Sequence, residues 1–187
     1  DPAEKVALDI GYGAGRLVNA ACAYFDRVIG IDVHGNTEVV ERFLRLQGKS
    51  NFKLLQGDGR TIDVESESID LVYSFIVMQH LISIHTLTNY IKETRRCLRR
   101  GGVAQIYFGR LEMHRIRDLA LYALRGFQEI SDPSFRNRTL LLSGWKARRL
   151  VRDHGFEILD TGTSFKRVPD GYRLCRGGQY YVTARKP

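Results

Sequence analysis

The sequence predicts an α/β domain in which a parallel sheet carries helices on both faces. Two observations support this prediction. Short apolar runs alternate along the chain with helical patterns, and these runs are apolar throughout rather than at every second position. Strands that are buried on both faces have this continuous apolar character. Since 187 residues suffice for one substantial core, we expect residues 1–187 to form a single doubly wound domain.

Five apolar runs fit the strands of the parallel sheet, and they lie at 6–10, 28–32, 52–55, 69–75 and 103–108. Helical patterns lie between them at 15–25, 37–46 and 83–99. The third helix has one apolar stripe and ends in Arg95, Arg96, Arg99 and Arg100, followed by a glycine pair. Cations suit the C-terminal end of a helix dipole, so we interpret this cluster as a helix end before a binding patch.

The second part of the chain is less regular. Residues 112–126 have the pattern of an amphipathic helix, and the basic stretch 131–142 has the composition of a loop. A further helix is expected at 143–154, because Ser143 is a good N-cap residue and Gly155 ends the pattern. The runs 156–164 and 179–184 are typical of two late strands that could form an antiparallel pair.

Composition excludes several classes of protein. No apolar run approaches the roughly 18 residues of a membrane span, and no signal peptide is visible, so we expect a cytoplasmic protein without a membrane partner. The three cysteines are far apart and form no C-x-x-C pair, which indicates a reducing compartment and no structural zinc. A net charge of +8 permits a nucleic-acid partner, but the arginines are spread over several helices. No pattern indicates an oligomeric state.

Acidic and glycine residues follow the strands at the edge where an open α/β sheet binds its ligands. The stretch VALDIGYGAG places Asp9 before glycines at every second position, from Gly11 to Gly15. Asp32 ends the second strand, and Asp58 follows the third strand between two glycines. Three carboxylates are therefore expected at one edge of the sheet. Asp70, at the opposite end of its strand, is interpreted as structural.

Three ligands can be compared with this arrangement. A dinucleotide fits poorly, because Arg16 replaces the third glycine of G-x-G-x-x-G and Asp9 would repel a pyrophosphate. A P-loop is excluded by the lack of G-K-[ST]. S-adenosylmethionine fits, since its cationic groups suit Asp9, its ribose suits Asp32 and its adenine amino group suits Asp58. The glycines permit close approach of backbone to ligand, although Gly15 could equally serve helix packing.

Five motifs in order resemble those of the class I S-adenosylmethionine-dependent methyltransferases. They are VALDIGYGAGRL, VIGIDVHGN, LLQGDGRTI, SIDLVYSFIVMQHL and LRRGGVAQIYF, which together span about residues 6–108. The segments SGWKARRLVRDHGFEIL and QYYVTARKP are similar to the last units of that family. The resemblance implies a seven-stranded, mostly parallel sheet with a reversed last strand, which agrees with the expected antiparallel pair.

The resemblance also implies a cofactor site and a reaction. Methyl transfer from S-adenosylmethionine would leave S-adenosylhomocysteine, with no metal required. The methionine part would be held by Asp9 and the glycine loop, the ribose by Asp32, and the adenine by Asp58 and Gly59. Ser74 and Phe75 would contact the cofactor mainly through their backbone. The implied cofactor-binding set is Asp9, Gly11, Tyr12, Gly13, Asp32, Asp58, Gly59, Ser74 and Phe75.

His80 is the candidate general base, because it follows the fourth strand and an imidazole can accept a proton from a nucleophile. The alternative is that His80 packs against or caps the next helix. The remaining histidines, His34 among them, are interpreted as surface or cap residues, and no histidine pair has the spacing of metal ligands.

The methyl acceptor does not follow from the sequence. We expect a small molecule, because the segment 112–142 lies where the family inserts a substrate cover. One alternative is an RNA-modifying methyltransferase, which the net charge and the basic segments 136–138 and 148–152 favour. The other alternative is a non-catalytic cofactor-binding module. The chain begins at Asp1 and enters a strand at once. We therefore expect further sequence upstream, since the helices that usually precede this strand and help to close the pocket are missing.

Overall fold

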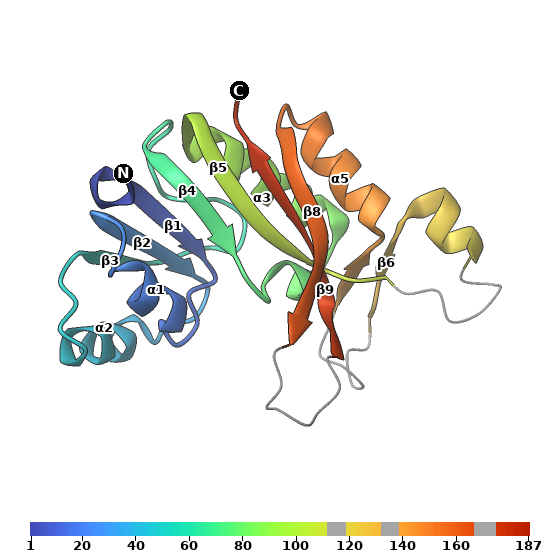
Figure 1. Ribbon diagram of the computed structural model, residues 1–187. Coiled ribbons are helices and arrows are strands. Elements are labelled where there is room, and N and C mark those ends of the chain that lie inside the picture. The colour runs from blue at the N-terminus through green and yellow to red at the C-terminus, as the bar shows by residue number, and fades with distance from the viewer. Residues whose placement is uncertain (112–118, 132–138, 167–174) are drawn as a thin grey trace.

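The computed structural model describes residues 1–111, 119–131, 139–166 and 175–187 (Figure 1). Its main sheet has seven strands in the order β3-β2-β1-β4-β5-β9-β8. The neighbours from β3 to β5 pair in parallel, whereas β9 is antiparallel to both β5 and β8. The predicted fold class, a doubly wound seven-stranded sheet with a reversed last strand, is confirmed.

The first four strands lie close to their predicted positions: β1 is Val6–Ile10, β2 is Arg27–Asp32, β3 is Phe52–Gln56 and β4 is Ile69–Ser74. The last strand of the parallel set, β5, is longer than predicted and runs Leu98–Gly109. The late pair consists of β8, Glu157–Lys166, and β9, Cys175–Arg185. Because β9 lies between β5 and β8, the final strand of the chain is an interior strand of the sheet.

Helices cover the two faces of the sheet separately (Figure 1). The short helix α1, Arg16–Ala21, and α2, Thr37–Leu46, pack over β2 and β3 through Val18, Val40 and Leu44. On the other face, α3, Ile84–Cys97, and α5, Gly144–Asp153, bury Leu87, Ile91 and Val151 in the larger core. Ser83 and Ser143 cap these two helices, since each hydroxyl accepts a hydrogen bond from the amide three residues later. There are also two 3-10 turns: η1 (Pro2–Glu4) precedes β1, and η2 (Met78–His80) lies between β4 and α3.

The region after β5 agrees with the sequence expectation in part: residues 119–125, within the predicted helix 112–126, are helical, whereas the predicted loop contains strand residues. The described residues contain a single π-helical turn, η3 (Leu121–Arg125), and a small antiparallel sheet of β6 (Phe127–Glu129) and β7 (Leu140–Leu142). The loop predicted over 131–142 is therefore wrong at its end, because Leu140 and Leu142 are fully buried against the main core. The segments 112–118 and 132–138, on which the rest of the helix and loop predictions fall, lie outside the described residues.

Two polar side chains connect strands of the main sheet. Asp70 accepts hydrogen bonds from the amide of Val6 at 2.8 Å and from Arg99 at 2.9 Å, which confirms its structural interpretation. Ser74 is fully buried, and its hydroxyl donates to the carbonyl of Ile10 at 3.1 Å. In the described ranges, no helix is both long and apolar enough to span a membrane.

Candidate active site

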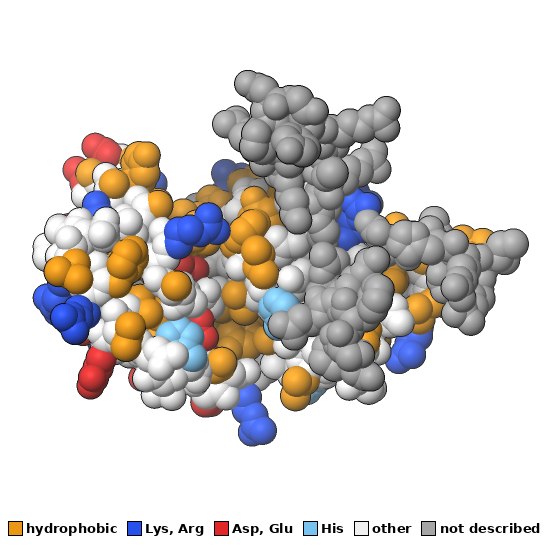
Figure 2. All heavy atoms as spheres, turned by 90° about the horizontal axis from the view of Figure 1, so that it is seen from below, with side chains coloured by type: hydrophobic (Ala, Val, Ile, Leu, Met, Phe, Trp, Pro, Cys, Tyr) orange, Lys and Arg blue, Asp and Glu red, His pale blue; other side chains and the backbone are white. Residues whose placement is uncertain are grey.

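A cleft of about 270 Å³ opens at the carboxyl ends of β1, β2 and β3. Figure 2 looks onto this edge of the molecule and shows hydrophobic, histidine and acidic side chains around a hollow. Of the predicted site residues, the cleft is lined by Gly11, Asp32, Gly59 and His80. A second cavity of about 400 Å³ lies at the opposite ends of the strands, where it includes Val6, Arg27 and Arg99. It is remote from the residues that the sequence places at the site.

Asp32 holds the glycine loop against the end of β2. One of its carboxylate oxygens accepts the amide of Gly13 at 2.8 Å, and the other accepts the amide of Val33 at 2.7 Å. His34 closes the same loop from outside, with Nε2 3.0 Å from the carbonyl of Gly13. Since Nδ1 of His34 accepts the amide of Asn36, Nε2 carries the proton and donates to that carbonyl. His34 is a partly exposed residue just before α2, as interpreted, and it also binds the glycine loop without lining the cleft.

The three glycines of the loop have different roles. A Cβ on Gly11 would lie 2.1 Å from Cγ2 of Val77, so this glycine lets the turn after β4 close over the loop. A Cβ on Gly15 would lie 2.7 Å from Val40, which favours the packing role for Gly15. A Cβ on Gly13 would meet nothing within 4 Å, which leaves its backbone open. All three have positive φ angles, which only glycine adopts without strain.

Tyr12 points away from the cleft. Its ring is 4% exposed in the core under α1 and α2, and its hydroxyl lies 3.0 Å from Oγ1 of Thr37. The ring also packs edge-on against His34, with centroids 4.9 Å apart. The side chain of Tyr12 therefore supports the loop from below, and any contact of Tyr12 with a cofactor would involve its backbone.

Asp9 lies beneath the loop and is 1% exposed. Among the described residues, neither of its carboxylate oxygens has a partner at full hydrogen-bonding geometry. Burial, with a further contribution from the charge of Asp32, raises the pKa of Asp9 to about 7, although the nearby hydroxyl of Tyr73 favours the ionised form and acts against this rise. Unpaired buried acceptors are costly in proteins. Within the described residues, Asp9 is thus a buried acceptor without a well-formed hydrogen bond.

Asp58 begins a tight turn after β3. Its carboxylate accepts the amides of Arg60 and Thr61, each at 2.7 Å, and the hydroxyl of Thr61 at 3.1 Å. These hydrogen bonds, first of all those from the backbone, lower the pKa of Asp58. Asp58 therefore stabilises the turn and does not line the cleft, whereas the neighbouring Gly57 and Gly59 do.

His80 is an exposed residue of η2 at the cleft wall. Its Nε2 lies 3.1 Å from Nε2 of the Gln79 amide, and Gln79 itself is buried. Ser74 and Phe75 precede this turn but do not line the cleft: Ser74 binds Ile10, and Phe75 packs edge-on against Tyr107 at 5.0 Å. In the described parts of the chain, no group of three or more His, Cys, Asp or Glu side chains could hold a metal ion.

The described end of the segment 112–142 lies against η2. Thr139 donates its amide to the carbonyl of Gln79 at 2.8 Å and its hydroxyl to the carbonyl of Leu81 at 2.8 Å. From β6, the carboxylate of Glu129 accepts the amide of Ile84 at the start of α3. The turn that carries His80 and the start of α3 after it are therefore both held by this segment.

Several apolar cleft residues did not follow from the sequence analysis. Tyr90 reaches the cleft from α3 as part of that helix's apolar face, and Val33, Ile76, Val77 and Leu81 follow β2 and β4. The one available signal was position, since Val33 and Ile76 come directly after predicted strand ends. Ile76 has a φ of 64°, a conformation that is strained for a β-branched residue.

We expect Ile76→Asn to raise the free energy of unfolding by about 1 kcal/mol, because asparagine tolerates left-handed backbone. Ile76 is 45% exposed, so little buried apolar contact is lost in exchange. Urea denaturation measures the change. Ile76→Val is the matched control and should gain nothing, since valine is equally β-branched. A less stable Ile76→Asn protein would contradict this prediction. It would show that the apolar contacts of the Ile76 side chain stabilise the fold by more than its left-handed backbone destabilises it.

The chain resembles known proteins in both sequence and structure. Residues 8–106 match the family model described as a methyltransferase domain. A S-adenosylmethionine-dependent methyltransferase structure from Methanosarcina mazei is 18% identical with a TM-score of 0.74 and covers 98% of this chain and 93% of its own. The structure of the YcgJ protein of Bacillus subtilis is 16% identical with a TM-score of 0.73, and the match covers 98% of this chain and 92% of YcgJ. The [4+2]-cyclase SpnF has 17% identity, a TM-score of 0.73, and coverage of 100% and 76%.

These similarities define the class of the protein. The solved structures share the fold, and no curated protein sequence is detectably similar to the chain. The family model covers more than half of the chain, from Leu8 in β1 to Ile106 in β5. The chain therefore belongs to the methyltransferase domain family, as its motifs implied, and that membership implies S-adenosylmethionine as the cofactor.

Proposed function

We propose that this protein transfers the methyl group of S-adenosylmethionine to a small-molecule acceptor in the cleft. The observation that carries the proposal is Asp32, a carboxylate at the end of β2 that lines the cleft and is bonded to the glycine loop. A carboxylate at this place can accept both hydroxyls of a ribose.

The residues present fit the cofactor. Asp32 would take the ribose, Gly57 to Gly59 would border the adenine, and the exposed backbone of Gly13 would admit the methionine part. Asp9 supports the same fit, because its two oxygens lack a well-formed hydrogen bond in the described protein and a cationic ligand above the loop would supply a partner. The apolar side chains of the cleft, such as Ile10, Ile31 and Val33, exclude water from bound ligand.

S-adenosylmethionine supplies a methyl group on a cationic sulfur that leaves without protonation. What remains for the protein is to orient the acceptor in line with that methyl group, and such orientation can contribute on the order of 7–11 kcal/mol. The rigid turn between β4 and α3 suits this task, since Met78 and Gln79 are buried and Thr139 binds the carbonyl of Gln79.

His80 is proposed as the base for an acceptor that must lose a proton. The amide of Gln79 can face the imidazole with its nitrogen or, after a half-turn, with its oxygen. With the oxygen, Gln79 would accept the proton of Nε2 and leave Nδ1 as the acceptor that a base requires. This arrangement would also give a partner to Oε1 of Gln79, which has none in the described protein.

A small molecule is favoured over RNA by the charge of the cleft. None of the described residues that line it is lysine or arginine, whereas an RNA groove uses cations along the phosphate backbone. The described part of the segment 112–142 lies beside His80, which supports its role as a cover. An RNA substrate would instead reveal itself by binding that weakens steeply with salt.

The test is calorimetric titration of S-adenosylmethionine and S-adenosylhomocysteine into the protein, with NAD as the control ligand. We expect both sulfur ligands to bind and NAD not to bind. Asp32→Ala should lower the affinity for S-adenosylmethionine at least about 30-fold. The substitution removes charge-assisted hydrogen bonds to the ribose and the hydrogen bond that holds Gly13. Asp32→Asn keeps one acceptor oxygen, so its affinity for S-adenosylmethionine should lie between those of the wild-type protein and Asp32→Ala.

A folded Asp32→Ala protein that binds S-adenosylmethionine normally would refute the proposed site. Binding of the cofactor without S-adenosylhomocysteine production from any acceptor would favour the non-catalytic module. It would also be compatible with a different reaction on the same fold. One of the similar structures is named as a [4+2]-cyclase.

A further inference from the structure

We propose that Arg96, together with Glu93, is a positioning residue for the nucleoside half of the cofactor. The inference rests on the proposed function and concerns the cofactor loop, defined here as residues 57–66. This loop borders the cleft with Gly57 and Gly59 and contains the turn of Asp58. Arg96 lies on α3 and touches neither the cleft nor these glycines, so it would act through the loop.

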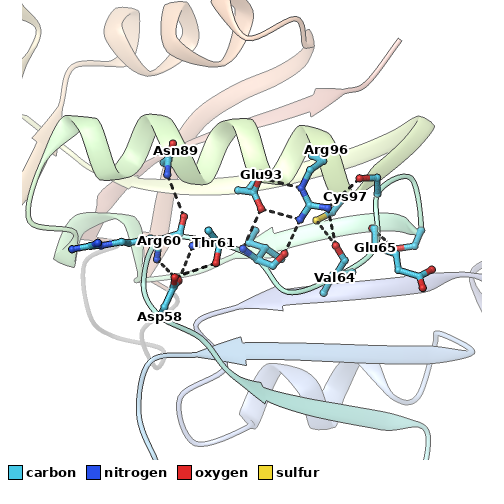
Figure 3. Close-up of polar contacts among 12 residues, drawn as sticks. Asp58, Arg60, Thr61, Val64, Glu65, Asn89, Glu93, Arg96 and Cys97 are labelled. Carbon is cyan, nitrogen blue, oxygen red and sulfur yellow. Dashed lines mark hydrogen bonds and ion pairs between the residues drawn. The ribbon is translucent and has the colours of Figure 1, made fainter.

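The cofactor loop has no regular structure of its own. It joins β3 to β4 without a helix, so its backbone groups need partners from elsewhere. Figure 3 shows that these partners come from one side of α3, which lies along the loop. Asn89, Glu93 and Arg96, spaced at one turn of the helix, bind the loop at Arg60, Ile62 and Val64.

Arg96 uses its whole guanidinium group in these contacts. One terminal nitrogen donates to the carbonyl of Val64 at 2.8 Å and to the hydroxyl of Ser66 at 3.1 Å. The other donates to the carbonyl of Ile62 at 2.7 Å and to Glu93 at 2.8 Å, and Nε donates to the second oxygen of Glu93 at 3.0 Å. A lysine could not reproduce this planar set of donors.

Glu93 completes the clamp from the other side. Its carboxylate accepts the amide of Ile62 at 3.2 Å as well as the two donors of Arg96. The hydrogen bonds with Arg96 lower the pKa of Glu93, so this carboxylate is ionised at neutral pH. Both backbone groups of Ile62 are thus fixed, the amide by Glu93 and the carbonyl by Arg96.

The clamp reaches the cleft through a short chain of contacts. Ile62 is 1% exposed and follows Thr61, whose amide and hydroxyl both bind Asp58. Asp58 lies between the two glycines that line the cleft. Tyr90, one residue after Asn89 on α3, lines the cleft itself. The helix therefore sets the distance between its own cleft residue and the loop opposite.

The experiment compares Arg96→Lys with Arg99→Lys. Arg99 is the matched control, because it binds Asp70 and the carbonyl of Glu67 beyond the cofactor loop. Calorimetry would measure the affinity for S-adenosylhomocysteine and for S-inosylhomocysteine, which lacks the adenine amino group. We expect Arg96→Lys to bind S-adenosylhomocysteine about tenfold more weakly and to lose most of the preference between the two ligands. Arg99→Lys should behave as the wild-type protein.

The outcomes separate this inference from the proposed function. If the wild-type protein does not bind S-adenosylhomocysteine, the proposed function itself fails. If it binds but shows no preference between the two ligands, or if Arg96→Lys keeps both affinity and preference, the inference is wrong. General destabilisation would lower both affinities without changing their ratio. Should Arg96→Lys not fold, Glu93→Gln takes its place, because the amide keeps one acceptor for Ile62 and loses the ion pair.

Discussion

Gly11→Ala is expected to destabilise the protein by roughly 2–5 kcal/mol. The new methyl group would lie 2.1 Å from Cγ2 of Val77, and the backbone φ of 82° is strained for any residue with a Cβ. Left-handed backbone costs about 1–2 kcal/mol for alanine, and overpacking typically adds about 1–3 kcal/mol. Val77 has little room to yield, because Met78 and Gln79 directly after it are buried. The free energy of unfolding in urea measures the loss.

Gly13→Ala is the matched control for this prediction. Its φ of 52° is also left-handed, but its new methyl group would have no heavy atom within 4 Å. Only the backbone cost applies, so we expect a loss of about 1 kcal/mol. Equal losses at the two glycines would show that the turn after β4 can move away from the loop.

Asp9→Asn is expected to stabilise the protein by roughly 2–3 kcal/mol at pH 8 and by little at pH 4. The pKa of Asp9 rises from 3.8 to about 7 on folding, so keeping this carboxylate ionised in the folded state costs about 4 kcal/mol. The asparagine avoids that cost, but its buried amide is itself destabilising by about 1–2 kcal/mol, which reduces the net gain. Chemical denaturation at several pH values measures the difference.

The pH dependence has a definite sign. Well below pH 3.8, Asp9 is protonated in both the folded and the unfolded protein, and it does not change the free energy of unfolding. Between about pH 4 and pH 7 the unfolded chain releases a proton that the folded protein retains, so the wild-type protein loses stability as the pH rises. Above pH 7 the cost is constant. Asp9→Asn should lack this decline, and a decline of unchanged size would assign it to other groups.

The same variant tests whether Asp9 has a role in binding. Only the ionised carboxylate attracts a cation, and with a pKa of about 7 its ionised fraction rises mainly between pH 6 and pH 8. We therefore expect S-adenosylmethionine to bind the wild-type protein more tightly at pH 8 than at pH 6. Asp9→Asn should bind weakly at both. A stabilised variant with unchanged affinity would reduce Asp9 to a buried structural residue.

Strands with strong local signals were predictable from the sequence. The runs that became β1, β2 and β4 are mostly apolar, and residues 37–46 have the helical spacing of apolar side chains that predicted α2 at its observed bounds. The residues 98–102 were assigned to a helix end and a turn, yet they belong to β5. Their pairing depends on distant groups: the amide of Gly101 donates to the carbonyl of Lys186, and Nζ of Lys186 donates to the carbonyl of Leu98. Local propensity cannot register such contacts.

The site was predictable where its residues lie at strand ends. Asp32, Gly11, Gly59 and His80 reach one cleft because parallel strands end at one edge of the sheet. The role of His34 depends on a side chain that folds back 21 positions onto Gly13, and no local pattern shows this. Likewise, Arg96 has the sequence signature of a helix end, and only the folded chain shows that its partners are the carbonyls of Ile62 and Val64.

The position of β9 has a consequence for the order in which the molecule can assemble. During synthesis the segments from β1 to β5 emerge first, and each strand after β1 finds a parallel neighbour already made. Strand β8 emerges before β9 but has no partner in the sheet except β9. The β8 segment must therefore wait, unpaired, until residues 175–185 have been made and can enter between it and β5. Assembly of the cleft-bearing half can thus precede closure of the sheet, and in the interval β5 presents an open edge that β9 later covers.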